Sequence, residues 1–116
     1  MKINLKIHTL MWEIHFKDFS SDFDPLDETQ DNEQDLGITK RSCDTILINK
    51  SIGDDLLMRT IIHELTHAYF WSYGLTQIKN LTEENFADFM ETHGRNILRD
   101  SEFIYNKYKG NSHDRK

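Results

Sequence analysis

The feature that most restricts the fold of this chain is a long apolar run, Leu56–Leu75, with the sequence HELTH at its centre, His63–His67. Apolar residues recur in this run at the three- and four-residue intervals of a helix with one buried face. Asp54 or Asp55 can cap the start of that helix, and Gly74 is typical of the residue that follows a helix. The run therefore predicts a rigid helix that carries both histidines near its middle.

Two histidines four positions apart lie one above the other on the same side of a helix. His63 and His67 can therefore hold a zinc ion from one side. Glu64 can then act as a general base on a water bound to that metal. The alternative is a pair of helix histidines that face solvent or are hydrogen-bonded in the core.

A catalytic zinc site needs a third protein ligand from a separate element, and a second predicted helix offers one. That helix begins at Thr82 and carries Glu84 and Asp88, which are four positions apart and share a face. We expect Glu84 to bind zinc. We expect Asp88 to accept a hydrogen bond from the outer ring nitrogen of a ligand histidine. His93 leaves the helix about half a turn away from Glu84 and is the weaker candidate ligand.

Four short segments that precede the motif helix predict strands. Ile3–Ile7 and Trp12–Phe16 alternate apolar with polar residues, as half-buried strands do, and a hairpin near His8–Leu10 joins them. Leu36–Arg41 follows, and then Thr45–Asn49, whose β-branched residues lie between turn formers. Four strands followed by two helices predict an α+β fold with a small N-terminal sheet, mixed or antiparallel.

The length of 116 residues predicts a single domain, residues 1–116. Residues 18–35 are rich in Asp and Ser, contain the only proline, and predict an exposed acidic loop. The spacing of its acidic residues does not match an EF-hand calcium loop. Residues 109–116 predict a disordered tail.

Charge and cysteine content limit the classes of partner. The net charge of −6 argues against nucleic-acid binding, which needs a basic face. No segment approaches a membrane span, and Met1–Ile7 alternates instead of forming the apolar part of a secretory signal. The single cysteine, Cys43, cannot form an intrachain disulfide, so a cytoplasmic location is expected. Cys43 as a nucleophile or metal ligand is the lesser alternative to a packed thiol.

The motif HELTHA at His63–Ala68, followed by E-x-x-x-D at Glu84–Asp88, resembles the gluzincin clan of zinc metallopeptidases. The match covers about Thr60–Glu91. The order of strands, motif helix and glutamate helix is also similar to minigluzincins and to the ImmA/IrrE-like zincins of phages and mobile elements. The resemblance implies a zincin-like fold with Zn²⁺ held by His63, His67 and Glu84, with Glu64 as the catalytic base and Asp88 supporting a histidine. The large second domain of full-sized gluzincins is missing, so their cleft wall has no assignable counterpart.

The resemblance further implies hydrolysis of peptide bonds in a narrow protein substrate, such as a regulator or repressor. An extended peptide is expected to pair with an edge strand, either Thr45–Asn49 or Leu36–Arg41. Tyr69, Tyr73 or His93 could supply a hydrogen bond to the developing oxyanion.

Two other functions compete with proteolysis. The first is a protein-binding module that is stabilised by zinc, because a domain of this size gains stability from a structural metal. The second is a latent enzyme whose open metal position is filled by the tail Tyr105–Lys116, for example through His113. Glu64 has no role in a purely structural zinc site, which favours the peptidase.

Overall fold

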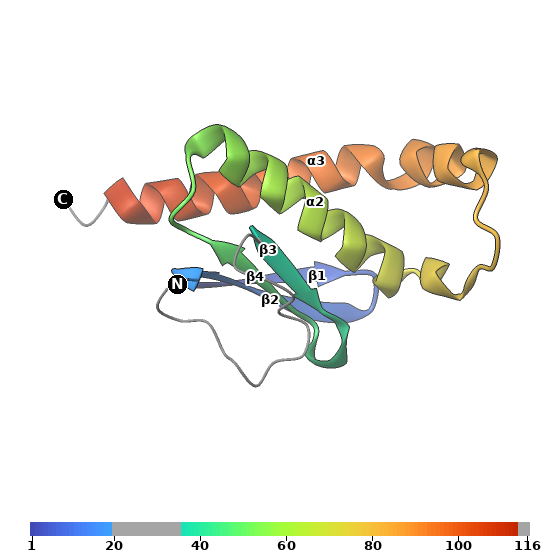
Figure 1. Ribbon diagram of the computed structural model, residues 1–116, viewed down its shortest axis with the longest axis horizontal. Helices are drawn as coiled ribbons and strands as arrows, with labels where there is room; N and C mark the ends of the chain where they lie inside the picture. The colour runs from blue at the N-terminus through green and yellow to red at the C-terminus, as the bar shows by residue number, and fades with distance from the viewer. Residues whose placement is uncertain (20–35, 114–116) are drawn as a thin grey trace.

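The computed structural model describes residues 1–19 and 36–113, without the side chains of residues 111–113. Two helices cover one face of a four-stranded sheet, which confirms the predicted α+β fold (Figure 1). Most of the predicted acidic loop, residues 20–35, lies outside the described residues. So do residues 114–116 of the predicted tail and the side chain of His113.

The sheet is mixed, with the order β1-β2-β4-β3. Its strands are β1 (Lys2–Ile7), β2 (Leu10–Lys17), β3 (Gly37–Lys40) and β4 (Thr45–Asn49). The two outer pairs are antiparallel, whereas β2 and β4 run parallel at the centre. All four predicted strands are therefore present. Strand β4 has the predicted bounds, and the ends of the other three differ from the prediction by at most two residues.

Tight turns join the antiparallel pairs. His8 has a φ of 57° in the predicted hairpin between β1 and β2. Between β3 and β4, the short 3₁₀ helix η1 (Arg41–Cys43) is followed by Asp44 with a φ of 51°. A short polar side chain tolerates this left-handed conformation, which is why Asp suits the position.

The face of the sheet that contacts the helices is formed by residues that lie opposite one another on neighbouring strands. Ile3 pairs with Ile14, Ile14 with Ile46, and Ile46 with Thr39. The three isoleucines in this row are at most 2% exposed. Thr39 is thus the polar end of an otherwise apolar row, directly beneath a helix.

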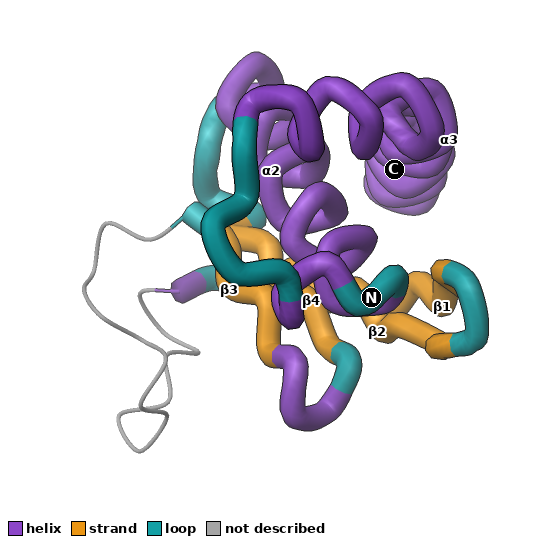
Figure 2. The backbone as a smooth tube through the Cα atoms, turned by 90° about the vertical axis from the view of Figure 1, so that its right-hand side faces the viewer, coloured by secondary structure: helices purple, strands orange, loops and turns teal. Residues whose placement is uncertain are grey.

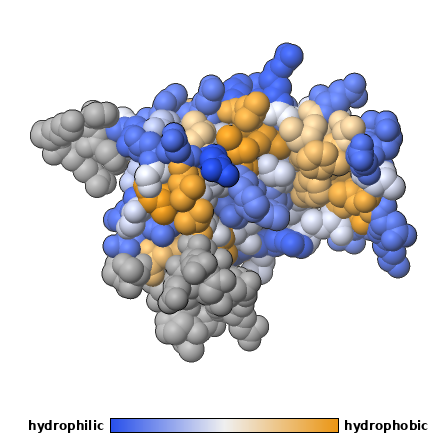
Figure 3. Space-filling model, turned by 45° about the horizontal axis from the view of Figure 1, so that its top comes forward, coloured by the Kyte–Doolittle hydropathy of each residue, from blue (hydrophilic) through white to orange (hydrophobic). Residues whose placement is uncertain are grey.

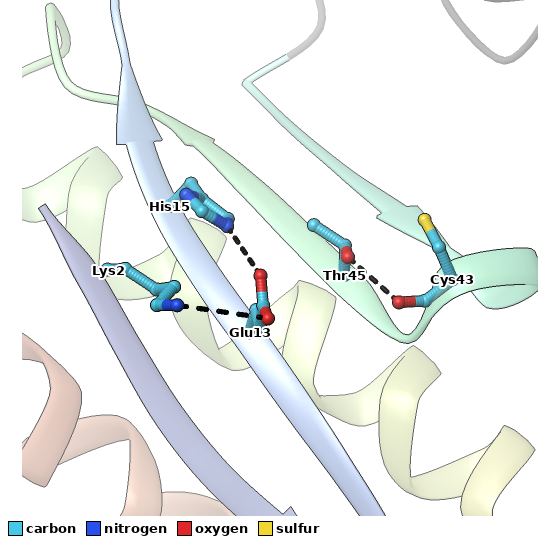
Figure 4. A network of polar contacts seen from close by, with 5 residues as sticks. All are labelled: Lys2, Glu13, His15, Cys43 and Thr45. Carbon is cyan, nitrogen blue, oxygen red and sulfur yellow. Dashed lines mark hydrogen bonds and ion pairs between the residues drawn. The ribbon is translucent and has the colours of Figure 1, made fainter.

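The opposite face of the sheet carries most of its polar side chains, and several of them contact one another (Figure 4). The Nε2 atom of His15 lies 3.1 Å from Oε1 of Glu13, and Nζ of Lys2 lies 4.0 Å from Oε2 of the same carboxylate. This places His15 on the polar side of its strand, as the alternation predicted, and away from the histidine pair.

The motif helix α2 (Asp54–Ser72) begins where the sequence predicted. Its N-cap is Gly53, with no side-chain cap, so the expected cap by Asp54 or Asp55 is wrong and both lie in the first turn. Gly74 follows the helix with a φ of 74°, a conformation that favours glycine. Its buried side chains pack on the sheet, where Nε1 of Trp12 donates a buried hydrogen bond of 2.8 Å to Oγ of Ser72.

After the 3₁₀ helix η2 (Leu75–Gln77), the chain forms the long helix α3 (Glu83–His113). Thr82 and Asn85 cap its start reciprocally, because the backbone N–H of each is bonded to the side-chain oxygen of the other. The helix continues without a break past Gly94 and through most of the region expected to be a tail. That region is therefore helical up to His113.

Helix α3 runs back along α2 in the opposite direction (Figures 1 and 2). Nζ of Lys109 lies 2.8 Å from Oδ1 of Asp54 at one end, and the hydroxyl of Tyr69 donates a hydrogen bond of 2.6 Å to Asp100. Figure 2 shows both helices on the same side of the sheet, with α2 above β3 and β4.

Within residues 1–19 and 36–113, no helix combines the length and the apolar content needed to cross a membrane.

Candidate metal centre

The two histidines of the motif lie side by side on the exposed surface of α2. The ring centroids of His63 and His67 are 4.9 Å apart, and their planes are inclined by 73°. Both side chains are exposed, because the buried side of α2 is turned toward the sheet. The spacing correctly predicted that the two rings lie side by side on one face of the helix.

Glu64 lies between the histidines in sequence, but its side chain turns toward the edge of the sheet. It is 7% exposed. The hydroxyl of Thr39 donates a hydrogen bond of 2.5 Å to Oε1 of Glu64 and lies 3.2 Å from its backbone carbonyl oxygen. A buried carboxylate needs such a donor, because burying an unpaired charge is costly.

Gly37 gives this carboxylate room. A Cβ atom built at Gly37 would lie 2.8 Å from Cγ of Glu64 and 2.9 Å from Cγ2 of Thr60, closer than real Cβ atoms approach. Helix α2 can therefore sit against β3 only because Gly37 has no side chain. This glycine is required for close approach of the two elements and not for an unusual φ.

A groove of about 350 Å³ opens between the start of β3 and the first half of α2. His63, Glu64 and Thr60 form its polar wall, and Leu36 and Leu56 give it apolar surface. Arg59, one helical turn before His63, completes the lining. The groove thus brings one histidine of the pair and the candidate base to the same wall.

The protonation of His67 favours ligand binding. Burial lowers the pKa of His67 below its ordinary 6.5, although the Glu64 carboxylate opposes this shift. The side chain is exposed overall, yet part of the ring is desolvated by its neighbours. Because a metal ligand must be neutral imidazole, a lowered pKa keeps the ring available near neutral pH.

The structure does not bring Glu84 to the histidine pair. Glu84 is exposed on the first turn of α3. The side of α3 that meets α2 there is marked by Phe89, whose ring centroid lies 4.4 Å from that of Phe70. Glu84 precedes Phe89 by five positions, so it leaves the helix about 140° away from that side.

Asp88 also lies away from the pair. It lines a separate hollow of about 220 Å³ beside η2, together with Asn85 and His93. In the described ranges, no group of three or more His, Cys, Asp and Glu side chains is positioned to hold a metal ion.

The candidate oxyanion donors Tyr69, Tyr73 and His93 lie together near the C-terminal end of α2. The ring of Tyr73 lies 4.2 Å from that of His93 and 4.5 Å from that of His8. Tyr69 is 4% exposed and bonded to Asp100, and burial raises its pKa above the ordinary value. None of the three lines the groove beside His63.

Of the two candidate edge strands, only β3 lies at an edge. Strand β4, Thr45–Asn49, is wrong as an edge because it has β2 on one side and β3 on the other. β3 pairs with β4, and no other described strand lies on its outer side. The strand Leu36–Arg41, observed as Gly37–Lys40, is therefore the edge next to the groove.

The residues present fit part of a zinc site. Two imidazoles on one helix face, one of them with a lowered pKa, match two of the three protein ligands of a catalytic zinc. The described residues do not place the third donor beside them.

Comparisons with protein-family models, with curated proteins and with solved structures find no match to this chain. The class of protein therefore rests on the motif and on the geometry of α2 and β3.

The sequence did not predict a role for three residues of the site. Gly37 leaves space for Glu64, Thr39 donates a hydrogen bond to it, and Arg59 lines the groove. A signal existed for Arg59, since it precedes His63 by four positions and so shares its helix face. No comparable signal existed for the strand residues, whose facing depends on how β3 pairs with β4.

Proposed function

We propose that this chain is a zinc-dependent metallopeptidase that uses Glu64 as its general base. The observation that carries the proposal is the joint placement of three side chains. His63 and His67 present their rings together on α2, and Glu64 is turned toward the groove along edge strand β3. A pair of surface histidines alone would not require a buried carboxylate next to it.

The chain's own residues supply the other parts of such a reaction. The outer edge of β3 offers backbone groups to which an extended peptide can pair, which would hold it along the groove. Glu64 would take the proton of the attacking water and deliver it to the leaving amine nitrogen. Thr39 fixes the direction of that carboxylate through its hydrogen bond. Zinc, when bound, supplies polarisation of the scissile carbonyl and acidification of the water.

His63 and His67 would hold the metal, and Glu84 remains the proposed third ligand on the basis of the gluzincin resemblance, with Asp88 as its proposed support. The placement of Glu84 on the outer side of α3 does not supply that ligand directly. The same resemblance supports a narrow substrate such as a regulatory protein of a phage or mobile element. A cytoplasmic location fits the exposed thiol of Cys43.

The test combines metal analysis with a cleavage assay on the full chain. Purified protein should contain zinc, and Glu64→Gln should retain zinc while cleavage falls by roughly a hundredfold or more. His63→Ala should lose both. Cleavage that persists in Glu64→Gln would overturn the proposed role of Glu64.

A second candidate function is a zinc-binding or latent module that binds a protein without cutting it. Two observations favour it: Glu84 is not gathered with the histidines, and apolar side chains are exposed where α3 begins. The right-hand end of Figure 3 shows this apolar surface. Its members are 41 to 49% exposed and are Ile78, Leu81, Phe86 and Met90. Unchanged partner binding in Glu64→Gln, with no cleavage by the parent chain, would support this candidate.

A further inference from the structure

Arg59 occupies a special place beside the histidine pair. It lines the groove against β3, and it also lines a shallow hollow of about 410 Å³ on the outer side of α2, next to His63 and His67. Among the described residues that line the groove, it is the only arginine or lysine. A ligand lying along either side of His63 would therefore meet its guanidinium.

The charge of Arg59 is not neutralised by its neighbours. Asp55 lies one turn before it on the same helix face, the usual position of an intrahelical ion pair. In the described part of the chain, however, no carboxylate lies within ion-pair distance of Arg59. The side chain is exposed, so its planar donors are free to bind an oxygen pair from a ligand.

A second guanidinium lies toward the other end of the histidine pair. Arg41, which follows β3, lies 5.6 Å from the ring centroid of Trp71 on α2. Trp71 lies one helical turn after His67, so this cation lies near the His67 end of the pair. The chain as a whole has a net charge of −6, whereas the histidine pair on α2 has an arginine near each of its ends.

The carboxylate of the site limits where a ligand anion can lie. Glu64 is the acidic residue of the groove lining, and its carboxylate is buried and bonded to Thr39. A ligand carboxylate would be repelled near Glu64 and attracted at Arg59. The apolar surface that Leu36 and Leu56 give to the groove would suit the carbon stem that carries the carboxylate.

We propose that the groove selects peptides with a carboxylate that faces Arg59, either an acidic side chain or a free C-terminus. Arg59 is then a specificity residue, and the substrate class is an acidic or C-terminal peptide segment. This inference rests on the proposed peptidase function, because it assumes that a peptide occupies the groove along β3. It assigns no chemical step to Arg59.

Binding to an inactive chain tests this selectivity separately from cleavage. The full-length Glu64→Gln protein, loaded with zinc, is titrated into short labelled peptides of alternating Thr and Val. One set carries a single Glu or Gln at successive positions, and a second set ends in a free or an amidated carboxyl group. The same titrations are repeated with Arg59→Gln, with Arg59→Lys, and with Arg95→Gln, a control at an exposed residue of α3 outside the groove lining.

We expect one carboxylate position to bind about threefold to tenfold more tightly than its neutral match. Arg59→Gln should abolish that preference, Arg59→Lys should keep part of it, and Arg95→Gln should leave it unchanged. The set that shows the preference distinguishes an acidic side chain from a free C-terminus. Zinc content and melting temperature measured for each variant show whether the fold is retained.

The inference is overturned if Arg59→Gln weakens charged and neutral peptides equally, if it has no effect, or if no peptide binds. Cleavage of the same peptides by the parent chain separates the two proposals. Cleavage without a carboxylate preference would overturn the role of Arg59 and leave the peptidase intact. A preference that depends on Arg59, without any cleavage, would support the site while the peptidase proposal fails.

Discussion

The hydroxyl of Thr39, on the edge strand, donates a hydrogen bond of 2.5 Å to the carboxylate of Glu64, on the motif helix. The two residues are 25 positions apart in sequence, and the bond joins the sheet to the proposed base. It leaves one oxygen of the carboxylate engaged and sets the direction of the other. Glu64 is therefore positioned by β3 as much as by α2.

Replacing Thr39 by Val should reduce cleavage while zinc remains bound. The substitution keeps the shape of the side chain but removes the donor, so a rate decrease of roughly tenfold to a hundredfold is expected. The buried carboxylate also loses its partner, which should lower the free energy of unfolding by about 1–3 kcal/mol. Zinc analysis, peptide cleavage and urea unfolding measure these effects.

Thr45→Val is the matched control, since the hydroxyl of Thr45 donates an exposed hydrogen bond to the backbone carbonyl of Cys43. This control should retain both activity and stability. Equal loss of cleavage in the two variants would mean that Thr39 has no particular role in positioning Glu64.

Gly37→Ala should separate β3 from α2. Its Cβ would meet Cγ of Glu64 at 2.8 Å and Cγ2 of Thr60 at 2.9 Å, so a side chain or the helix must shift. The free energy of unfolding should fall by about 1–3 kcal/mol, which chemical unfolding can measure. Gly110→Ala on α3 is the control, because nothing lies within 4 Å of the added atom. It should change stability by less than about 1 kcal/mol, in the stabilising direction. A Gly37→Ala protein as stable as the parent would contradict the close approach.

Glu84→Gln should lower zinc affinity if α3 supplies the third ligand when metal is bound. Removing an anionic donor from a three-ligand site should weaken zinc binding by roughly tenfold or more. Glu83→Gln is the control, because the adjacent residue leaves the helix about 100° away. Competition with a zinc-binding dye measures both affinities. Should the two variants bind zinc as well as the parent, the third ligand must be sought elsewhere.

The metal-free protein should lose stability as the pH falls below about 6.5. Burial lowers the pKa of His93 in the folded chain, and the nearby charge of His8 lowers it further. The unfolded chain therefore binds a proton at His93 first, so the free energy of unfolding falls as the pH drops through 6.5 toward the lower folded pKa. His67, whose pKa is also lowered, contributes in the same direction.

Urea unfolding at a series of pH values checks this dependence. His93→Gln should make the free energy of unfolding depend less steeply on pH. The dependence that is due to His67 should remain. His8→Asn removes a charge that lowers the pKa of His93, so the folded-state pKa of His93 should rise toward its ordinary value. Asn tolerates the φ of 57° at this position. A slope that His93→Gln does not change would assign the pH dependence to other groups.

Hydrophobic periodicity was sufficient to predict the four strands and helix α2, and the four-residue spacing predicted that the two histidines share a helix face. It could not predict which face of β3 meets the helix. Ile38 is the most apolar residue of that strand and is 6% exposed, yet it pairs with Leu47 on the face opposite the main core. Gly37 and Thr39 face α2 instead, because the Glu64 carboxylate needs space and a donor there. The sequence pattern within β3 cannot show that a residue on another element, Glu64 of α2, determines which side chains suit the strand.

The rotation of α3 about its own axis could not be predicted from the sequence either. Glu84 and Asp88 share a face by spacing, but spacing does not say which face of a helix packs. In the structure Phe89 and Ile97, both buried, mark the packed side of α3, and Tyr69 bonds to Asp100 across the two helices. Those contacts, and not the acidic pair, set the rotation of α3. The gluzincin resemblance supplied the expected ligand, and the described residues leave it as a prediction.

The parallel pairing of β2 with β4 has a practical consequence. The chain leaves the centre of the sheet after Lys17 and returns to the neighbouring position at Thr45, so β3 belongs to an excursion between two adjacent strands. That excursion could be exchanged for one from another protein while the hydrogen bonds that join β1, β2 and β4 are kept. An exchanged segment would still need a residue without a side chain at position 37 and a hydroxyl at position 39, because these two accommodate and bind Glu64 on α2.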